Sequence, residues 1–275
     1  MLGNNRTVIL TSNRPRHKHL IHKSLSSKYL DVVDIIIEPK IKKRSYKEIY
    51  KSNEVMQEWL KNYEIEEKNI FSEEIRNFKF NEIKSGELNT GEILEKLKKT
   101  KPDILLVFGT GLIKKELIDI IPIILNLHLG LSPFYRGTAT TIWPFINKQP
   151  EYNGATILKL DEGIDSGPIL KLVLAEYEKF EGSQNIHRIN NILNKKAIEV
   201  IIQEAESIAK GKKLITIKQN LSLGKLYKNK DFKPHHIIEA NNYMKSEFEK
   251  SFLNNYKMIK SNLISLLKRN GLPYC

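Results

Sequence analysis

The segments NLHLGLSPFYRG, residues 126–137, and GATILKLDEGIDSGPIL, residues 154–170, place polar groups inside apolar runs that are otherwise typical of buried strands. Polar side chains in such runs cost free energy unless they are paired or used. Side chains alternate between the two faces of a strand, so Asn126 and His128 share one face and Leu127 takes the other. An amide beside an imidazole suits the stabilisation of an oxyanion and the movement of a proton.

Outward from these segments, the chain alternates between segments that predict strands and segments that predict helices. Short apolar or β-branched runs predict strands over 7–10, 32–38, 104–108, 124–129, 155–160 and 169–174, with short strand or turn pieces at 70–71 and 78–80. Charged or amphipathic segments predict helices over 15–25, 42–64, 90–99, 114–120 and 186–208. This alternation predicts an α/β fold with a doubly wound, mostly parallel sheet. The loops after Leu10, Phe108 and Leu129 then lie at one carboxyl edge, where ligands bind in such sheets.

The last part of the chain has a different character. After Gly211 it is basic and rich in Asn, with a helical segment expected from His236 to Lys268. We therefore expect a catalytic domain over 1–210 and a small, basic, largely helical extension over 211–275. Its apolar residues could cover either a partner, as in a homodimer, or the chain's own core; they are Leu253, Ile259, Leu263, Leu266 and Leu267.

The net charge of +13 belongs to the two ends of the chain. Residues 1–30 carry six Lys or Arg and no acid, and residues 206–275 carry fourteen against five acids. Basic ends attract phosphates, although a Lys-rich solvated surface accounts for the C-terminal charge equally well.

Composition excludes several classes of protein. No apolar run approaches the ~20 residues of a membrane span, and the N-terminal run is too short for a secretory signal. The lone Cys275 excludes an intrachain disulfide framework and a cysteine zinc cluster, so a cytoplasmic location is expected. No metal is expected, because His17, His19 and His22 lie on a basic segment that would repel a cation.

Two blocks of this sequence resemble the signature of the formyltransferase family. The first resembles the pattern Asn-x-His-x-Ser-Leu-Leu-Pro-x-x-(Arg/Lys)-Gly, in the form Asn126-Leu127-His128, Pro133 and Tyr135-Arg136-Gly137. The second resembles the family's block that ends in its catalytic Asp, in the form Gly154-Ala155-Thr156-Ile157 and Asp161-Glu162-Gly163-Ile164-Asp165-Ser166-Gly167. The likeness covers roughly residues 6–210 and is strongest over 104–170. Gly130 and Ser132 depart from the pattern, where the family usually has Ser and Leu.

The resemblance implies an N-formyltransferase, which moves a formyl group from the co-substrate 10-formyltetrahydrofolate to a primary amine. It implies that Asn126 donates its amide to the oxyanion and that His128 relays the proton. Asp165 is then expected to orient the imidazole and bias its charge. From spacing alone, Asn126 and His128 would be interpreted as hydrogen-bonded polar residues of the core, and Asp165 as a residue that forms a turn.

Further binding residues follow from the resemblance and from position. The resemblance implies backbone contacts with the folate pterin near Gly111, Leu112, Ile113, Asp161 and Ile164. The turn after the first strand opens a helix whose N-terminal amides favour phosphate, and arginines can clamp a diphosphate. The residues expected to bind an anionic substrate are Asn13, Arg14, Arg16, His17 and Arg136.

Several acceptors are consistent with this family. A nucleotide-linked amino sugar used for surface polysaccharide, such as lipopolysaccharide, fits the basic loop and the short extension. Methionyl-tRNA would suit the positive ends, but that enzyme usually carries an all-β C-terminal domain. Glycinamide ribonucleotide formylation leaves residues 211–275 unexplained, and a catalytically silent binding protein of the same fold is the alternative from another class.

Overall fold

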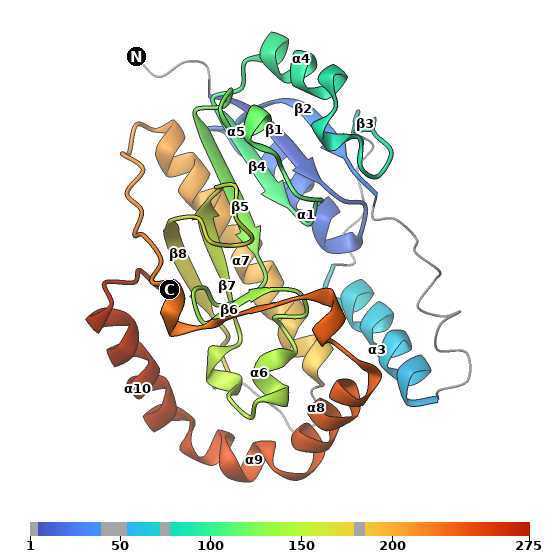
Figure 1. Cartoon of the computed structure of the whole chain (residues 1–275), viewed down its shortest axis with the longest axis vertical. Coiled ribbons are helices and arrows are strands. Elements are labelled where there is room, and N and C mark those ends of the chain that lie inside the picture. The colour runs from blue at the N-terminus through green and yellow to red at the C-terminus, as the bar shows by residue number, and fades with distance from the viewer. Residues whose placement is uncertain (1–4, 40–53, 72–77, 179–184) are drawn as a thin grey trace.

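The computed structural model describes residues 5–39, 54–71, 78–178 and 185–275. Within them a seven-stranded sheet has the order β3-β2-β1-β4-β5-β7-β8 (Figure 1). The strands are β1 (Arg6–Thr11), β2 (Asp31–Ile37), β3 (Asn81–Glu82), β4 (Ile104–Phe108), β5 (Ile123–His128), β7 (Gly154–Lys159) and β8 (Ile169–Leu174).

Strand direction confirms the expected doubly wound, mostly parallel sheet. β1 pairs in parallel with β2 on one side and β4 on the other, and β5 pairs in parallel with β4. The order therefore reverses at β1 and β4, whose last residues Thr11 and Phe108 are register partners. β7 runs antiparallel to β5 and to β8, so residues 160–168 form the loop of a β7–β8 hairpin.

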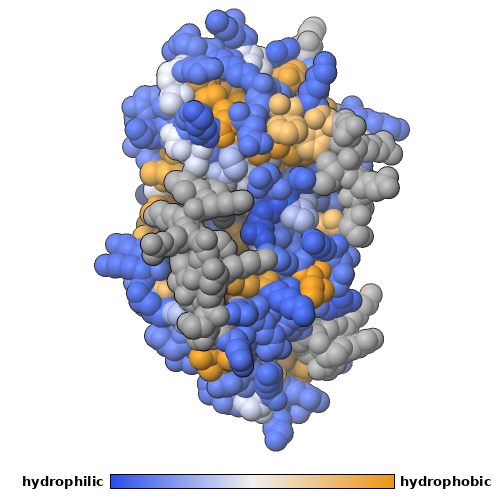
Figure 2. All heavy atoms as spheres, turned by 90° about the vertical axis from the view of Figure 1, so that its right-hand side faces the viewer, coloured by the Kyte–Doolittle hydropathy of each residue, from blue (hydrophilic) through white to orange (hydrophobic). Residues whose placement is uncertain are grey.

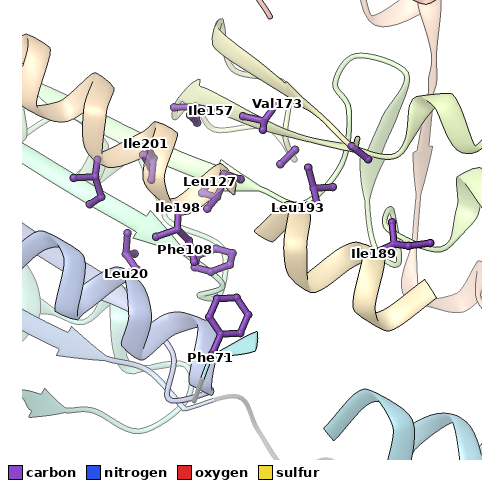
Figure 3. Packing of buried hydrophobic residues seen from close by; sticks show 14 of the residues in the cluster. Leu20, Phe71, Phe108, Leu127, Ile157, Val173, Ile189, Leu193, Ile198 and Ile201 are labelled. Atoms are coloured by element: carbon purple, nitrogen blue, oxygen red, sulfur yellow. The ribbon is translucent and has the colours of Figure 1, made fainter. Parts of the chain in front are cut away.

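Helices cover both faces of the sheet and form two apolar cores. The first core includes residues of α1 (Pro15–Leu25), α3 (Glu54–Ile70) and α7 (Ile186–Ala209). Figure 3 shows Ile198 and Ile201 of α7 close to Leu127 and Phe108 of the sheet. The second core lies under α4 (Gly91–Thr100) and α5 (Lys115–Ile118). Both faces of β4 are buried, which explains its continuous apolar sequence.

Some local expectations differ from the structure. Short strand or turn pieces were expected at 70–71 and 78–80; neither segment is a strand, because Ile70 ends α3, Phe71 lies in a bend and residues 78–80 are irregular. Residues 42–53 of the helix expected over 42–64 lie outside the described ranges, and among the described residues α3 runs from Glu54 to Ile70. Apolar residues at 70 and 71 pack at the end of a helix because α3 docks against α7, a contact that local pattern does not reveal.

The C-terminal part is largely helical, as expected, and packs on the chain's own core. The single helix expected over 236–268 is divided into α8 (Pro234–Ser246), α9 (Phe248–Ser251) and α10 (Tyr256–Arg269). Leu263 and Leu267 of α10 are buried in a third core beneath β8. The end of the chain lies beside β8, where the Leu172 N–H donates to the Pro273 carbonyl at 2.7 Å (Figure 1). Placing a domain boundary at residue 210 stays a prediction.

The surface is mixed in polarity. Figure 2 shows one face that is mostly hydrophilic, with hydrophobic residues in small groups. None of the helices in the described residues is long and apolar enough to cross a membrane.

Candidate active site

β5 carries the amide and the imidazole at its carboxyl end. Ile124, Asn126 and His128 follow one another on one strand face, and Ile124 is buried in the second core. Asn126 lies between Val107 of β4 and Leu158 of β7 in the strand register. It is half-buried, and its side chain forms no hydrogen bond with any residue of the described ranges. An amide donor is therefore free at the sheet edge.

The structure brings Asp165 against His128. The imidazole Nδ1 lies 3.2 Å from Asp165 Oδ2, and its Nε2 lies 3.1 Å from the Tyr135 carbonyl oxygen. The two side chains are 7% and 17% exposed, so the pair is buried but reachable at the carboxylate. Both acceptors can be satisfied at once only when both ring nitrogens carry a proton. This arrangement suits a group that holds and passes a proton.

Asp165 is held in its position by backbone contacts. Its φ of 51° lies in the left-handed region, which is uncommon for a residue other than glycine. Its Oδ2 accepts a hydrogen bond from the Gly137 N–H at 3.0 Å, and its carbonyl accepts one from Gln219 Nε2 at 2.9 Å. Such a conformation persists where surrounding structure over-determines it, and here it aims the carboxylate at His128.

The two loops expected to meet the pterin lie together at the same edge. Lys115, beyond the loop after β4, pairs with Glu162 of the hairpin loop at 3.4 Å. Leu112 and Ile164 are exposed apolar side chains on these loops, 61% and 50% exposed. Ile113, in contrast, is buried in the second core.

Asp161 organises the hairpin loop internally. Its carboxylate accepts hydrogen bonds from Ser166 Oγ at 3.0 Å and from the Gly163 N–H at 3.1 Å. The carboxylate thus shapes the loop that carries Asp165. Contact with a ligand by Asp161 stays a prediction.

The basic turn after β1 is already paired with an acid. Arg14 Nε lies 3.2 Å from Glu67 Oε2, and Arg16 Nη1 bonds both Glu67 Oε1 and the Tyr63 hydroxyl. Arg16 and Glu67 are 8% and 2% exposed, so this ion pair is part of the interior. Asn13 is exposed and Arg14 half-buried, which leaves these two accessible to a ligand. Substrate binding by this turn stays a prediction.

His17 and Arg136 are both buried. The His17 ring packs edge-on against Phe108 with centroids 4.6 Å apart, which places it under the end of β4. Arg136 lies on β6 (Tyr135–Gly137), the strand that also supplies the Tyr135 carbonyl and the Gly137 N–H. Its Nε is buried without a hydrogen-bond partner among the described residues.

A family model described as Formyl transferase matches residues 5–203. The chain belongs to the formyl transferase family. The match includes both sequence blocks and therefore Asn126, His128 and Asp165, whereas Gln219 lies beyond it.

Individual relatives match only part of this chain. Methionyl-tRNA formyltransferase of Clostridium beijerinckii is 31% identical over 122 residues, which are 44% of this chain and 38% of that protein. The alignment thus spans less than half of this relative.

Solved structures resemble this chain over most of its length. A 4-N formyltransferase from Francisella tularensis is 20% identical, with a TM-score of 0.56 over 86% of this chain and 87% of that one. An N-formyltransferase from Helicobacter canadensis, solved with folinic acid and dTDP-3-aminofucose, is 14% identical, with a TM-score of 0.51 over 86% and 78% of the chains. At these identities the likeness shows the fold.

The departure of this chain from the family's pattern at Gly130 has a steric reason. A Cβ at this position would lie 2.3 Å from His128 Nε2 and 2.6 Å from the Tyr135 carbonyl oxygen. The imidazole therefore occupies the space where the family's Ser would begin. Thr156 fixes the glycine by donating from Oγ1 to its carbonyl at 2.6 Å.

Three residues that sequence reasoning missed hold the site in place. Glu38, 4% exposed, accepts hydrogen bonds from the Gly111 and Gly86 N–H groups at 2.8 and 2.9 Å. Asn89 donates to the Leu112 carbonyl at 2.8 Å, and Gln219 supports the hairpin loop. An acid directly after a β-branched strand was a usable signal for Glu38, because such strands end at the binding edge. Asn89 and Gln219 carried no local signal.

Proposed function

We propose that this chain transfers a formyl group from 10-formyltetrahydrofolate to the primary amine of a nucleotide-linked amino sugar. The observation that carries the proposal is the amide of Asn126, which has no hydrogen-bond partner among the described residues, beside an imidazole whose Nδ1 lies 3.2 Å from Asp165. A donor for an oxyanion, a proton carrier and an orienting carboxylate are what acyl transfer to an amine requires.

Each side chain has a role in this reaction. The transfer forms a bond between the amine nitrogen and the formyl carbon and breaks the bond from that carbon to the folate nitrogen. Asn126 donates to the oxygen on which negative charge develops. His128 passes the proton that leaves the amine to the folate nitrogen, and Asp165 keeps the ring oriented.

The loops at this edge fit a flat heterocycle with a polar rim. Leu112 and Ile164 offer exposed apolar surface on two loops joined by the Lys115–Glu162 pair. The Gly111 N–H and the Leu112 carbonyl are bonded to Glu38 and Asn89, so a pterin would pair with other backbone groups of these loops. The folate supplies the formyl carbon and the leaving nitrogen.

The choice of a sugar acceptor rests on fold and length. The F. tularensis and H. canadensis structures are matched over 86% of this chain, beyond the family region and into the helical C-terminal part. The second of these was solved with a nucleotide-linked amino sugar. Asn13 and Arg14 at the turn after β1, together with Arg136 near His128, are proposed to contact the nucleotide and sugar. A role in surface polysaccharide follows from such an acceptor.

Methionyl-tRNA is the second candidate acceptor. It is favoured by the C. beijerinckii relative, which is a methionyl-tRNA formyltransferase, and by the basic ends of the chain.

A direct assay separates the two. The chain is incubated with 10-formyltetrahydrofolate and one acceptor at a time. The acceptors are UDP-, GDP- and dTDP-linked amino sugars and initiator methionyl-tRNA, and mass spectrometry detects the mass added by a formyl group. We expect one sugar class to gain a formyl group, tRNA to gain none, and His128→Ala to be inactive. Formylated tRNA would establish the second candidate, and no product with any acceptor would favour a silent binding protein.

A further inference from the structure

One segment of the C-terminal part, which includes a 3₁₀ turn at Leu221–Leu223, contacts both loops that flank His128. We call residues 217–227 the clasp. At its start, Ile217 and Ile169 exchange two backbone hydrogen bonds of 2.8 Å. At its end, β9 (Lys225–Tyr227) pairs in parallel with β6. One stretch of chain therefore touches the hairpin loop on one side and the loop after β5 on the other.

Gln219 of the clasp is bonded to the backbone around the proposed catalytic Asp. Its side-chain Nε2 donates to the Asp165 carbonyl at 2.9 Å and to the Gly167 carbonyl at 2.6 Å. A primary amide nitrogen has two hydrogens, so both acceptors are satisfied by this one group. Gln219 is 6% exposed, and its two bonds hold the carbonyl of Asp165, whose φ of 51° aims the carboxylate, and the carbonyl two residues further on.

The other end of the clasp fixes the groups that face the imidazole from β6. Tyr135, whose carbonyl lies 3.1 Å from His128 Nε2, is the register partner of Lys225. Gly137, whose N–H donates to Asp165 Oδ2, is the register partner of Tyr227. The approach is close, because a Cβ at Gly224 would lie 2.2 Å from Phe134 Cα.

We infer that the clasp sets the geometry of the His128–Asp165 pair and that Gln219 is a positioning residue for the proposed reaction. The groups of β6 that bond the His128 ring and the Asp165 carboxylate are tied to the clasp through β9, and the Asp165 carbonyl is bonded by Gln219 itself and, at 3.5 Å, by Ser132 Oγ. The inference rests on the proposed function for its kinetic consequence, whereas its structural consequence can be measured without any acceptor.

The test is Gln219→Met, which keeps the length and burial of the side chain and removes both donors. In ¹⁵N-labelled wild-type protein, we expect a hydrogen-bonded proton resonance on the His128 ring, assigned by its loss in His128→Gln. In Gln219→Met we expect this resonance to be lost or to exchange freely. We expect kcat to fall by about 10²-fold, the size typical of a misplacement of about 1 Å, with the KM for folate unchanged.

The control is Asn220→Ala in the same segment. The Asn220 side chain accepts hydrogen bonds from the Ser222 N–H and hydroxyl at 3.2 and 2.7 Å and lies on the exposed side. This variant should retain both the ring proton and kcat. If Gln219→Met does not fold, Gln219→Glu replaces it, because the carboxylate has the same length and no donor for the two carbonyls.

The outcomes are distinct. A wild-type ring without the resonance, or a Gln219→Met protein that keeps both resonance and kcat, overturns the inference. If the wild type has the resonance but formylates no acceptor, the proposed function fails and the resonance in Gln219→Met alone decides the role of the clasp.

Discussion

Two regions at the carboxyl edge of the sheet pair a basic side chain with a carboxylate, and they differ in what surrounds the pair. After β1, Glu67 forms ion pairs with both Arg14 and Arg16, and the Tyr63 hydroxyl accepts a hydrogen bond from Arg16. After β5, Asp165 faces His128 beside the Asn126 amide, which has no partner among the described residues. In the first region both carboxylate oxygens of Glu67 are paired with arginines, although Arg16 Nε has no partner among the described residues, whereas the second region leaves a half-buried amide donor for a ligand. A basic residue at a binding edge therefore does not by itself indicate a site, because an acid of the same protein can already take its charge.

The largest effect on free energy is expected at the ion pair between Glu67 and Arg16. Glu67→Gln removes the charge that Arg16 needs in the interior, and breaking a buried ion pair typically costs about 3–5 kcal/mol. We expect the free energy of urea unfolding to fall by about this amount, while kcat per folded molecule changes little. Glu58→Gln, exposed on the same helix, is the control and should change stability by less than about 0.5 kcal/mol. A stable Glu67→Gln protein would mean that the pair is not structural.

At the region after β5 we expect the opposite: a loss of activity with little change in stability. Asn126→Ala removes the free donor, and loss of an oxyanion donor costs about 2.7–4 kcal/mol of transition-state stabilisation, or about 10²–10³ in kcat. The melting temperature should change little, because no hydrogen bond to a described residue is lost. Steady-state kinetics and thermal unfolding measure the two quantities, with exposed Asn81→Ala as control. Near-normal turnover would refute the role of Asn126.

A buried histidine in the first region extends the comparison to pH. His187 packs against the Trp59 ring with centroids 4.0 Å apart, and burial lowers its pKa to about 4 from 6.5. Between pH 6.5 and 4 the unfolded chain binds a proton that the folded chain does not, so stability falls as pH falls through this window. The loss is at most about 3 kcal/mol.

Unfolding by urea at a series of pH values from 7 to 4 measures this contribution. His187→Gln should show a shallower loss of stability across the window than the wild type. Exposed His235→Gln should follow the wild type. Parallel curves for all three proteins would show that His187 is not held neutral in the fold.

The smallest effect is expected from adding a side chain next to His128 in the region after β5. Gly130→Ser places a Cβ against His128 Nε2 and the Tyr135 carbonyl, and overpacking of this kind costs about 1–3 kcal/mol. We expect a modest loss of stability and a lower kcat, because the ring must leave the Tyr135 carbonyl. Gly91→Ser, where a Cβ meets nothing within 4 Å, should be close to neutral in the same measurements. Higher activity in Gly130→Ser would show that the family's Ser fits this site after all.

Much of the fold could be predicted from sequence because it depends on local periodicity. The expected strand over 104–108 matches β4, and the helix expected over 186–208 matches α7 to within one residue. Asn126 and His128 were placed on one face for the same reason, since alternation along a strand is a local property. The residues at 70–71 were misassigned because their packing partners lie far away in the chain.

The amino-acid sequence by itself determined the alternation of strands and helices, the family, and the shared strand face of Asn126 and His128. Only the tertiary structure decided that Arg14 and Arg16 after β1 pair with Glu67. It also decided that the absence of a side chain at Gly130 leaves space for the imidazole, and that Gln219 bonds the backbone of Asp165. The reason is physical. Periodicity is fixed by neighbouring residues, whereas the partner of a buried charge or carbonyl is fixed by which distant segments the packed core brings within hydrogen-bond distance.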